Sequence, residues 1–119
     1  IQNRLKAKGL PWERAKAFDG SAVLSPFVSF EVPIESLSMT LHIDDKLRQH
    51  ANYDLMMYKP DIMLKEIGSF MTLEDGDIIM SGTPKGVGTY TAGQTFTGRV
   101  YADGTLLIEQ TWRVTERQP

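Results

Sequence analysis

The chain has 119 residues, of which 41% are hydrophobic and 24% charged, and its formal net charge is -2. This length suits one compact domain, and the apolar content is high enough to exclude an intrinsically disordered chain. The interleaved charges give no electrostatic basis for binding nucleic acid or an anionic membrane, and no apolar run approaches the ~20 residues of a membrane helix. We therefore expect a single domain over residues 1–119, with no nucleic-acid partner and no membrane partner.

Cysteine is absent, which excludes disulfides, thiolate nucleophiles and cysteine-ligated metal sites from this chain. This composition fits a reducing compartment, and we expect a cytoplasmic protein. Residues 1–8 have helical character from the start, with Ile1 and Leu5 on one face and no initiating methionine. They resemble a helix that has been cut, so we expect an N-terminal part of the same domain to precede them.

The first helix is expected to end at Gly9, because glycine favours the C-cap and Pro11 prevents continuation. Residues 11–21 then predict an ordered loop or short turn. Residues 22–33 combine β-forming side chains with Pro26 and Pro33, and such prolines belong at strand edges and bends.

A β-hairpin is predicted next. Residues 37–43 are apolar at every second position, which is typical of a strand with one buried face. Asp44 and Asp45 supply the turn, and residues 46–49 return as the partner strand.

The pattern changes to a helix after Asp54. Pro60 suits the first helical turn and Asp61 suits the positive end of the helix dipole. The apolar stripe comprises Ile62, Met63, Ile67 and Phe70, and Gly68 lies near the helix end.

The last third of the chain predicts a turn, a short strand and a second hairpin. Residues 73–77 form the turn and residues 78–80 a short buried strand, directly before a glycine-rich loop. Residues 95–101 are expected to pair with 105–114 around Ala102-Asp103-Gly104. The six methionines are expected to fill core space. The fold class is therefore α+β and predominantly β, with two helices.

The loop Ser81-Gly82-Thr83-Pro84-Lys85-Gly86-Val87-Gly88 is the first candidate site. Its glycines allow a sharp turn and a close approach of backbone N–H groups to a ligand, and the Thr83 hydroxyl can donate to a carboxylate. The loop is neither a Walker motif nor a dinucleotide-binding fingerprint. Considered alone, it is more often a structural connection between strands.

Lys16 is the second candidate, because it lies among Trp12, Ala15, Ala17 and Phe18 in sequence. A lysine among apolar groups loses hydration, and its ammonium can orient an anionic substrate. Considered alone, it is more often a surface lysine that lies over aromatic surface.

The histidines and the acidic cluster are weaker candidates. His42 and His50 have no metalloprotease spacing and no nucleophile motif, so we interpret both as structural or exposed. Glu74, Asp75 and Asp77 are interpreted as a turn rather than a metal site.

Three segments, in this order along the chain, closely resemble the C-terminal half of the fumarylacetoacetate hydrolase family. They are Gly9-Leu10-Pro11-Trp12-Glu13-Arg14-Ala15-Lys16-Ala17-Phe18-Asp19, then Leu73-Glu74-Asp75-Gly76-Asp77-Ile78-Ile79-Met80, and finally the glycine loop. The resemblance runs from Gln2 to about Val114 and is strongest to the acylpyruvase and oxaloacetate-decarboxylase-like branch. It implies a mixed β-sheet roll with peripheral helices, usually as a homodimer.

The resemblance also implies a function. It indicates hydrolysis of a carbon–carbon bond in acylpyruvates (2,4-dioxo acids) through an enolate bound to Mg²⁺ or Mn²⁺, with a small 2-oxo acid as the substrate. Lys16 and Gln2 match catalytic positions, and Thr83 and Gly82 match substrate-binding positions. The family's metal ligands match no residue of this chain and lie upstream of Ile1. The same intermediate serves an oxaloacetate decarboxylase or a homoprotocatechuate-pathway isomerase or decarboxylase, and an inactive fragment or binding module is the alternative from another class.

Overall fold

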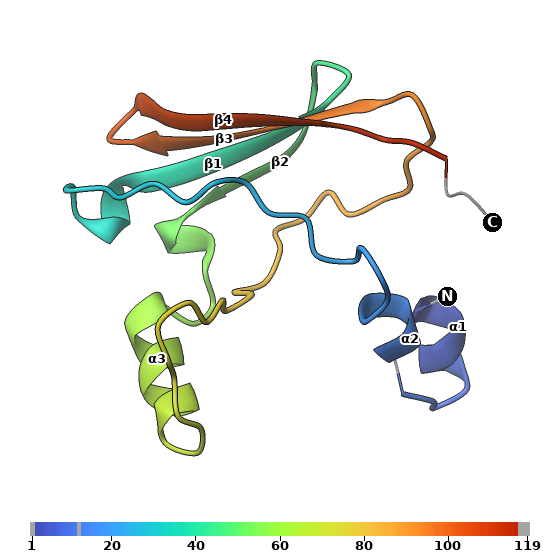
Figure 1. Ribbon diagram of the computed structural model, residues 1–119, viewed down its shortest axis with the longest axis horizontal. Helices are drawn as coiled ribbons and strands as arrows, with labels where there is room; N and C mark the ends of the chain where they lie inside the picture. The colour runs from blue at the N-terminus through green and yellow to red at the C-terminus, as the bar shows by residue number, and fades with distance from the viewer. Residues whose placement is uncertain (1, 12, 117–119) are drawn as a thin grey trace.

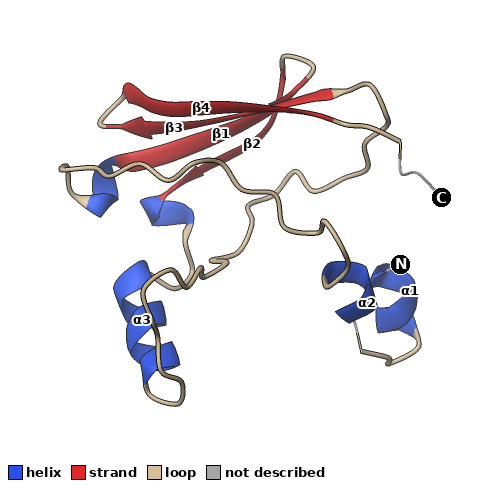
Figure 2. Cartoon of the chain, in the orientation of Figure 1, coloured by secondary structure: helices blue, strands red, loops and turns tan. Residues whose placement is uncertain are grey.

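One antiparallel sheet, with helices on one side of it, organises the molecule (Figures 1 and 2). The computed structural model describes residues 2–11 and 13–116. The strands lie in the order β2-β1-β3-β4, and each of the three neighbouring pairs is antiparallel. Their bounds are β1 Leu37–Ile43, β2 Lys46–Asn52, β3 Thr95–Ala102 and β4 Thr105–Arg113. The helices are α1 Gln2–Ala7, α2 Glu13–Lys16 and α3 Pro60–Gly68, with 3₁₀ turns at Ile34–Ser36 and Tyr53–Leu55.

Both predicted hairpins are confirmed, and their turns explain why. Asp44 and Asp45 have φ values of 48° and 66°, and Asp103 and Gly104 have 53° and 80°. Two consecutive positive φ values match the twist of the flanking strands, and aspartate and glycine tolerate this conformation best. The return strand β2 runs to Asn52, three residues beyond the predicted Gln49.

The sheet has an apolar face toward the helices and a polar face away from them. Met39 pairs with both Ala51 and Val100, and these side chains share the helical side. Thr40 and Arg99 pair on the opposite face. Among the described residues, Ile43 is the single hydrophobic side chain classed as buried, at 7% exposure. The prediction of an α+β, predominantly β fold is confirmed. A mixed sheet was expected, whereas the described strands pair only in antiparallel fashion.

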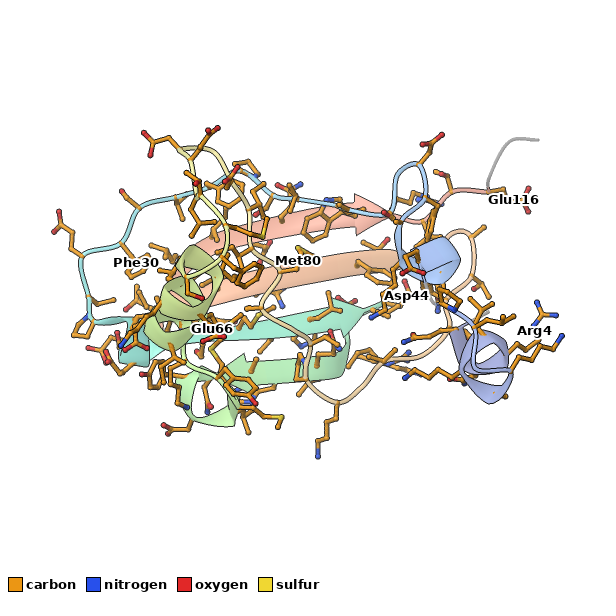
Figure 3. The ribbon with its side chains drawn as sticks, turned by 90° about the horizontal axis from the view of Figure 1, so that it is seen from below. Arg4, Phe30, Asp44, Glu66, Met80 and Glu116 are labelled. Atoms are coloured by element: carbon orange, nitrogen blue, oxygen red, sulfur yellow. The ribbon has the colours of Figure 1, made fainter. Side chains whose placement is uncertain are left out.

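Two local predictions were wrong. The segment at Glu13–Lys16 is a short helix, so three α-helices rather than two are present among the described residues. The expected strand at 78–80 is an unpaired loop, with Ile78 and Met80 exposed at 49% and 74%. Figure 3 shows Met80, and Glu66 of α3, in front of the sheet rather than within it. An apolar triplet forms a strand only where a neighbour accepts its backbone hydrogen bonds, and β1 to β4 pair with one another instead.

Helix α3 begins as predicted, with Pro60 in its first turn. Lys59, the residue before it, donates from Nζ to the carbonyl oxygens of Tyr53 and Met56 at 2.7 and 3.0 Å. The lysine thereby ties the 3₁₀ turn after β2 to the start of α3. None of the described helices is long and apolar enough to cross a membrane.

Candidate functional site

The glycine loop lies against an irregularity in the edge strand β2. Leu41 pairs with Gln49 and His42 pairs with Leu47, so Arg48 is the extra residue of a β-bulge. Gly86 has a φ of +106°, and a Cβ there would overlap the Arg48 carbonyl oxygen. A Cβ on Gly88 would lie 2.7 Å from Arg48 Nη2. Glycine is therefore required at Gly86 by its positive φ and by the backbone of the bulge, whereas at Gly88 the flexible end of the Arg48 side chain could move aside.

Gln49 joins the loop to the same strand. Its Nε2 donates to Thr83 Oγ1 at 3.0 Å and to the Pro84 carbonyl oxygen at 3.3 Å. Gln49 was not among the predicted site residues, although the predicted return strand of the first hairpin included it. The alternation of β2 placed it on a defined face, but a hydrogen bond spanning 34 residues has no local sequence signal.

Gly82 and Thr83 line a hollow of about 570 Å³ between the apolar face of the sheet and the segment leading into α3. Its remaining lining comprises Ile34, Leu37, Ser38, Met39, Ala51, Asn52, Tyr53, Leu55, Met56, Met57, Tyr58, Pro60, Met63, Ser81, Pro84 and Val100. No charged side chain lines it, and hydroxyl and amide groups provide its polarity. Four of the six methionines lie here, but the prediction that the methionines fill core space was wrong, because Met39, Met57, Met71 and Met80 are 41%, 91%, 57% and 74% exposed.

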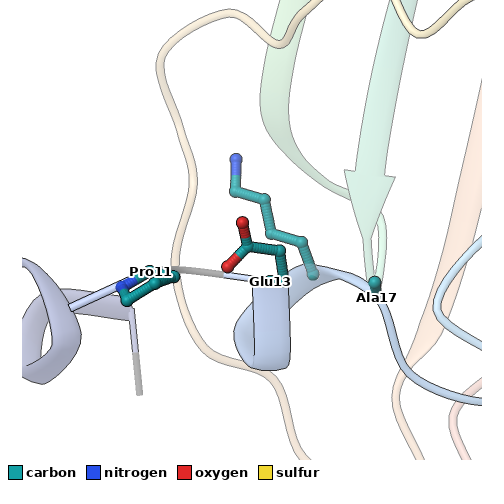
Figure 4. A pocket seen from close by; sticks show the side chains of 4 residues that line it. Pro11, Glu13 and Ala17 are labelled. Atoms are coloured by element: carbon teal, nitrogen blue, oxygen red, sulfur yellow. The ribbon is translucent and has the colours of Figure 1, made fainter.

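Lys16 lines a different hollow, of about 400 Å³, together with Pro11, Glu13 and Ala17 (Figure 4). Its side chain is exposed, and Phe18 is 49% exposed, so the described residues do not form the apolar surroundings considered for this lysine. Trp12, the other aromatic neighbour of Lys16 in sequence, lies outside the described residues. The side chains of Glu13 and Lys16, which have opposite charges, both line this hollow.

The four predicted site residues are therefore distributed over three elements. Gly82 and Thr83 lie together, Lys16 lies in the last turn of α2, and Gln2 is half-buried in the first turn of α1 and lines neither hollow. Their assigned roles remain predictions.

Charged groups on the polar face of the sheet pair with one another. Arg99 Nε lies 2.6 Å from Glu109 Oε2, and Arg99 Nη1 lies 3.4 Å from His42 Nδ1. The hydrogen bond with Glu109 is the largest of the contributions that raise the pKa of Arg99. This arrangement supports the structural interpretation of His42.

A divalent ion does not fit the residues that the structure describes. No group of three or more His, Asp or Glu side chains converges among them. The acidic cluster forms a turn, as predicted: the Glu74 N–H donates to Asp77 Oδ2 at 2.9 Å, and the Asp77 N–H donates to the Glu74 carbonyl at 3.1 Å.

The family model described as fumarylacetoacetate (FAA) hydrolase C-terminal matches residues 1–112. The chain belongs to the fumarylacetoacetate hydrolase family. The match agrees with the C-terminal position inferred from the two motifs. Relatives of the chain in this family are named as enzymes.

Two relatives are named oxaloacetate tautomerases. The mitochondrial FAHD1 protein of Bos taurus is 41% identical over 74% of this chain and 41% of its own length. YcgM of Escherichia coli is 34% identical over 82% of this chain and 46% of its own length. The chain thus spans less than half the length of these two relatives.

Solved structures of family members share the fold. The yeast family protein ynq8 superposes with a TM-score of 0.88 at 27% identity, over 99% of this chain and 52% of that protein. Maleylpyruvate hydrolase from Sphingobium sp. SYK-6 gives 0.62 at 32% identity, over 70% of this chain and 30% of the enzyme.

Proposed function

We propose that the complete protein is an enzyme that forms or protonates the enol of a small 2-oxo acid, with oxaloacetate as the reference substrate. The proposal is carried by Thr83 and Gly82, which present a hydroxyl and an open backbone at an uncharged hollow. The tautomerase names of the relatives support this substrate class.

Each residue has a role that follows from its chemistry. The Thr83 hydroxyl donates a hydrogen bond to the substrate carboxylate, and Gly82, with a φ of +105°, lets the backbone approach it. The Lys16 ammonium stabilises the negative charge that develops on the enolate oxygen. Gln2 orients the substrate from α1. Lys16 and Thr83 line separate hollows in the described residues. The proposal therefore requires that α2 and the glycine loop face one common substrate site in the complete protein.

Hydrolysis of an acylpyruvate is the second candidate. It is favoured by the structural similarity to maleylpyruvate hydrolase, and the same cation and carboxylate donor would serve it. In this reaction water attacks the distal carbonyl carbon, the carbon–carbon bond breaks, and the electron pair remains on the enolate of the 2-oxo acid. Lys16 would stabilise that enolate.

Mg²⁺ or Mn²⁺ remains part of the proposal as a requirement for turnover. Since the described residues offer no ligand set, the ion would have to take its ligands from elsewhere in the complete protein. The residues of this chain would then act on the substrate side of the site.

Enol–keto conversion of oxaloacetate, its decarboxylation and the hydrolysis of acetylpyruvate should be measured in parallel, with Mg²⁺ and with a chelator. We expect turnover that needs the ion and that falls about 10²–10³-fold in Lys16→Ala, the range found when one charge-stabilising group is removed. Lys65→Ala, an exposed lysine of α3, is the matched control and should turn over normally. Equal turnover in both variants would remove Lys16 from the mechanism. Faster hydrolysis than tautomerisation would favour the second candidate, and no turnover at all would favour a binding module.

A further inference from the structure

We propose that Gln49 is a positioning residue that fixes the direction of the Thr83 hydroxyl, so that its proton points away from β2 and toward the substrate carboxylate. The inference rests on the proposed role of Thr83 as the carboxylate donor. It adds a residue of the edge strand to the site.

The orientation of the Gln49 side-chain amide is settled by Pro84. The Pro84 carbonyl oxygen can only accept a hydrogen bond, so the amide group 3.3 Å from it must be the NH₂ and not the oxygen. The same Nε2 lies 3.0 Å from Thr83 Oγ1. Its two hydrogens therefore serve two acceptors, one on the backbone and one on the threonine hydroxyl.

The consequence for Thr83 follows from the composition of a hydroxyl group, which has one proton and two lone pairs. Oγ1 accepts from Gln49, so its own proton is not used in that contact. The proton remains available for a carboxylate, and the incoming hydrogen bond polarises the O–H bond toward donation. A donor aimed before the substrate arrives needs no reorganisation on binding.

The bulge keeps this contact in register. Arg48 is the extra residue of β2, and the backbone of Gly86 packs on its carbonyl oxygen. The loop cannot slide along β2 without a clash at that point. Gln49, the next residue, is thereby held at a constant distance from Thr83.

The test uses Gln49→Glu in the complete protein. An ionised carboxylate can only accept, so the Thr83 hydroxyl would donate its hydrogen bond to the introduced carboxylate instead of to the substrate. The introduced carboxylate would also face a second acceptor, the Pro84 carbonyl oxygen, and would have the same charge as the substrate carboxylate. We expect the KM for oxaloacetate and the Kd for oxalate, used as a non-reacting probe, to rise about 10-fold or more, with a smaller change in kcat. Gln110→Glu, a half-buried glutamine of β4, is the matched control and should leave both constants unchanged.

The pH profile separates positioning from a purely structural role. A protonated carboxyl can donate, so oxalate affinity in Gln49→Glu should recover toward the unsubstituted value as the pH is lowered from 7 toward 4, through the ordinary pKa of glutamate of about 4.3, while Gln110→Glu follows the unsubstituted protein. A second pair removes the donor altogether: Gln49→Leu should weaken oxalate binding, but should add nothing in a Thr83→Val background.

Three results would overturn the inference: unchanged oxalate affinity in Gln49→Glu, a loss without pH-dependent recovery, or equal effects of Gln49→Leu in both backgrounds. If the unsubstituted protein neither turns over a 2-oxo acid nor binds oxalate, the proposed function itself is wrong. That failure occurs in the parent protein rather than in the variants, so the two outcomes are distinguishable.

Discussion

Gly86→Ala, compared with Gly76→Ala, tests whether the glycine loop is held against the edge strand. Both glycines have positive φ values, +106° and +93°, so alanine costs about 1–3 kcal/mol of backbone strain at either site. The surroundings differ. A Cβ on Gly86 would overlap the Arg48 carbonyl oxygen, whereas a Cβ on Gly76 would meet nothing within 4 Å.

Forcing a methyl group into a packed contact costs about 1–3 kcal/mol further. We therefore expect Gly86→Ala to lower the free energy of unfolding by about 1–3 kcal/mol more than Gly76→Ala does, or, where the loop yields instead, to raise the KM for oxaloacetate. Urea unfolding of the complete protein and steady-state kinetics measure the two effects. If both variants lose the same stability and keep the same KM, the contact with Arg48 does not hold the loop.

Two further predictions concern the segment between β2 and α3. Desolvation, followed by the charges of Asp61 and Glu35, raises the pKa of Tyr53 above its ordinary value near 10. The neutral phenol is favoured in the folded state, so this stabilisation is complete below pH ~10 and is lost as the pH rises through the raised pKa. Tyr53→Phe should thus remove the highest-pH phase of the ultraviolet phenolate titration and reduce alkaline destabilisation; an unchanged titration would contradict the assignment. Lys59→Met should cost about 1–2 kcal/mol in urea unfolding, because two charge-assisted hydrogen bonds are lost, while the exposed Lys65→Met should cost little.

The elements that could be predicted from sequence are those that local rules determine. The hairpin turn at Asp44-Asp45 needs residues that tolerate positive φ, and the start of α3 needs the fixed φ of Pro60; both signals lie within a few residues. Residues 78–80 show the limit. Their apolar character is local, but a strand also requires a partner, and the sheet order that provides none is a property of the whole chain.

The candidate site could likewise be predicted only where its signal is local in the sequence. Thr83 and Gly82 were found because their motif is contiguous, and they do lie together. Gln49 was missed because its importance depends on the bulge at Arg48, which brings β2 beside a loop 34 residues away. Lys16 was found by its motif, and its exposed position agrees with the surface lysine that was favoured when the residue was considered alone.

The glycines of the loop differ in their surroundings. Under the proposed function, this difference indicates on which side of the sheet the substrate binds. Gly86 is needed for packing on the backbone of Arg48, whereas Gly82 lines the hollow. On the opposite face of the sheet, the guanidinium of Arg99 already bonds to Glu109 and lies next to His42. A carboxylate that approached Arg99 would have to break this ion pair, whereas at Thr83 it meets a hydroxyl whose proton Gln49 leaves unused. The proposed function therefore predicts that a 2-oxo acid binds on the helical side of the sheet.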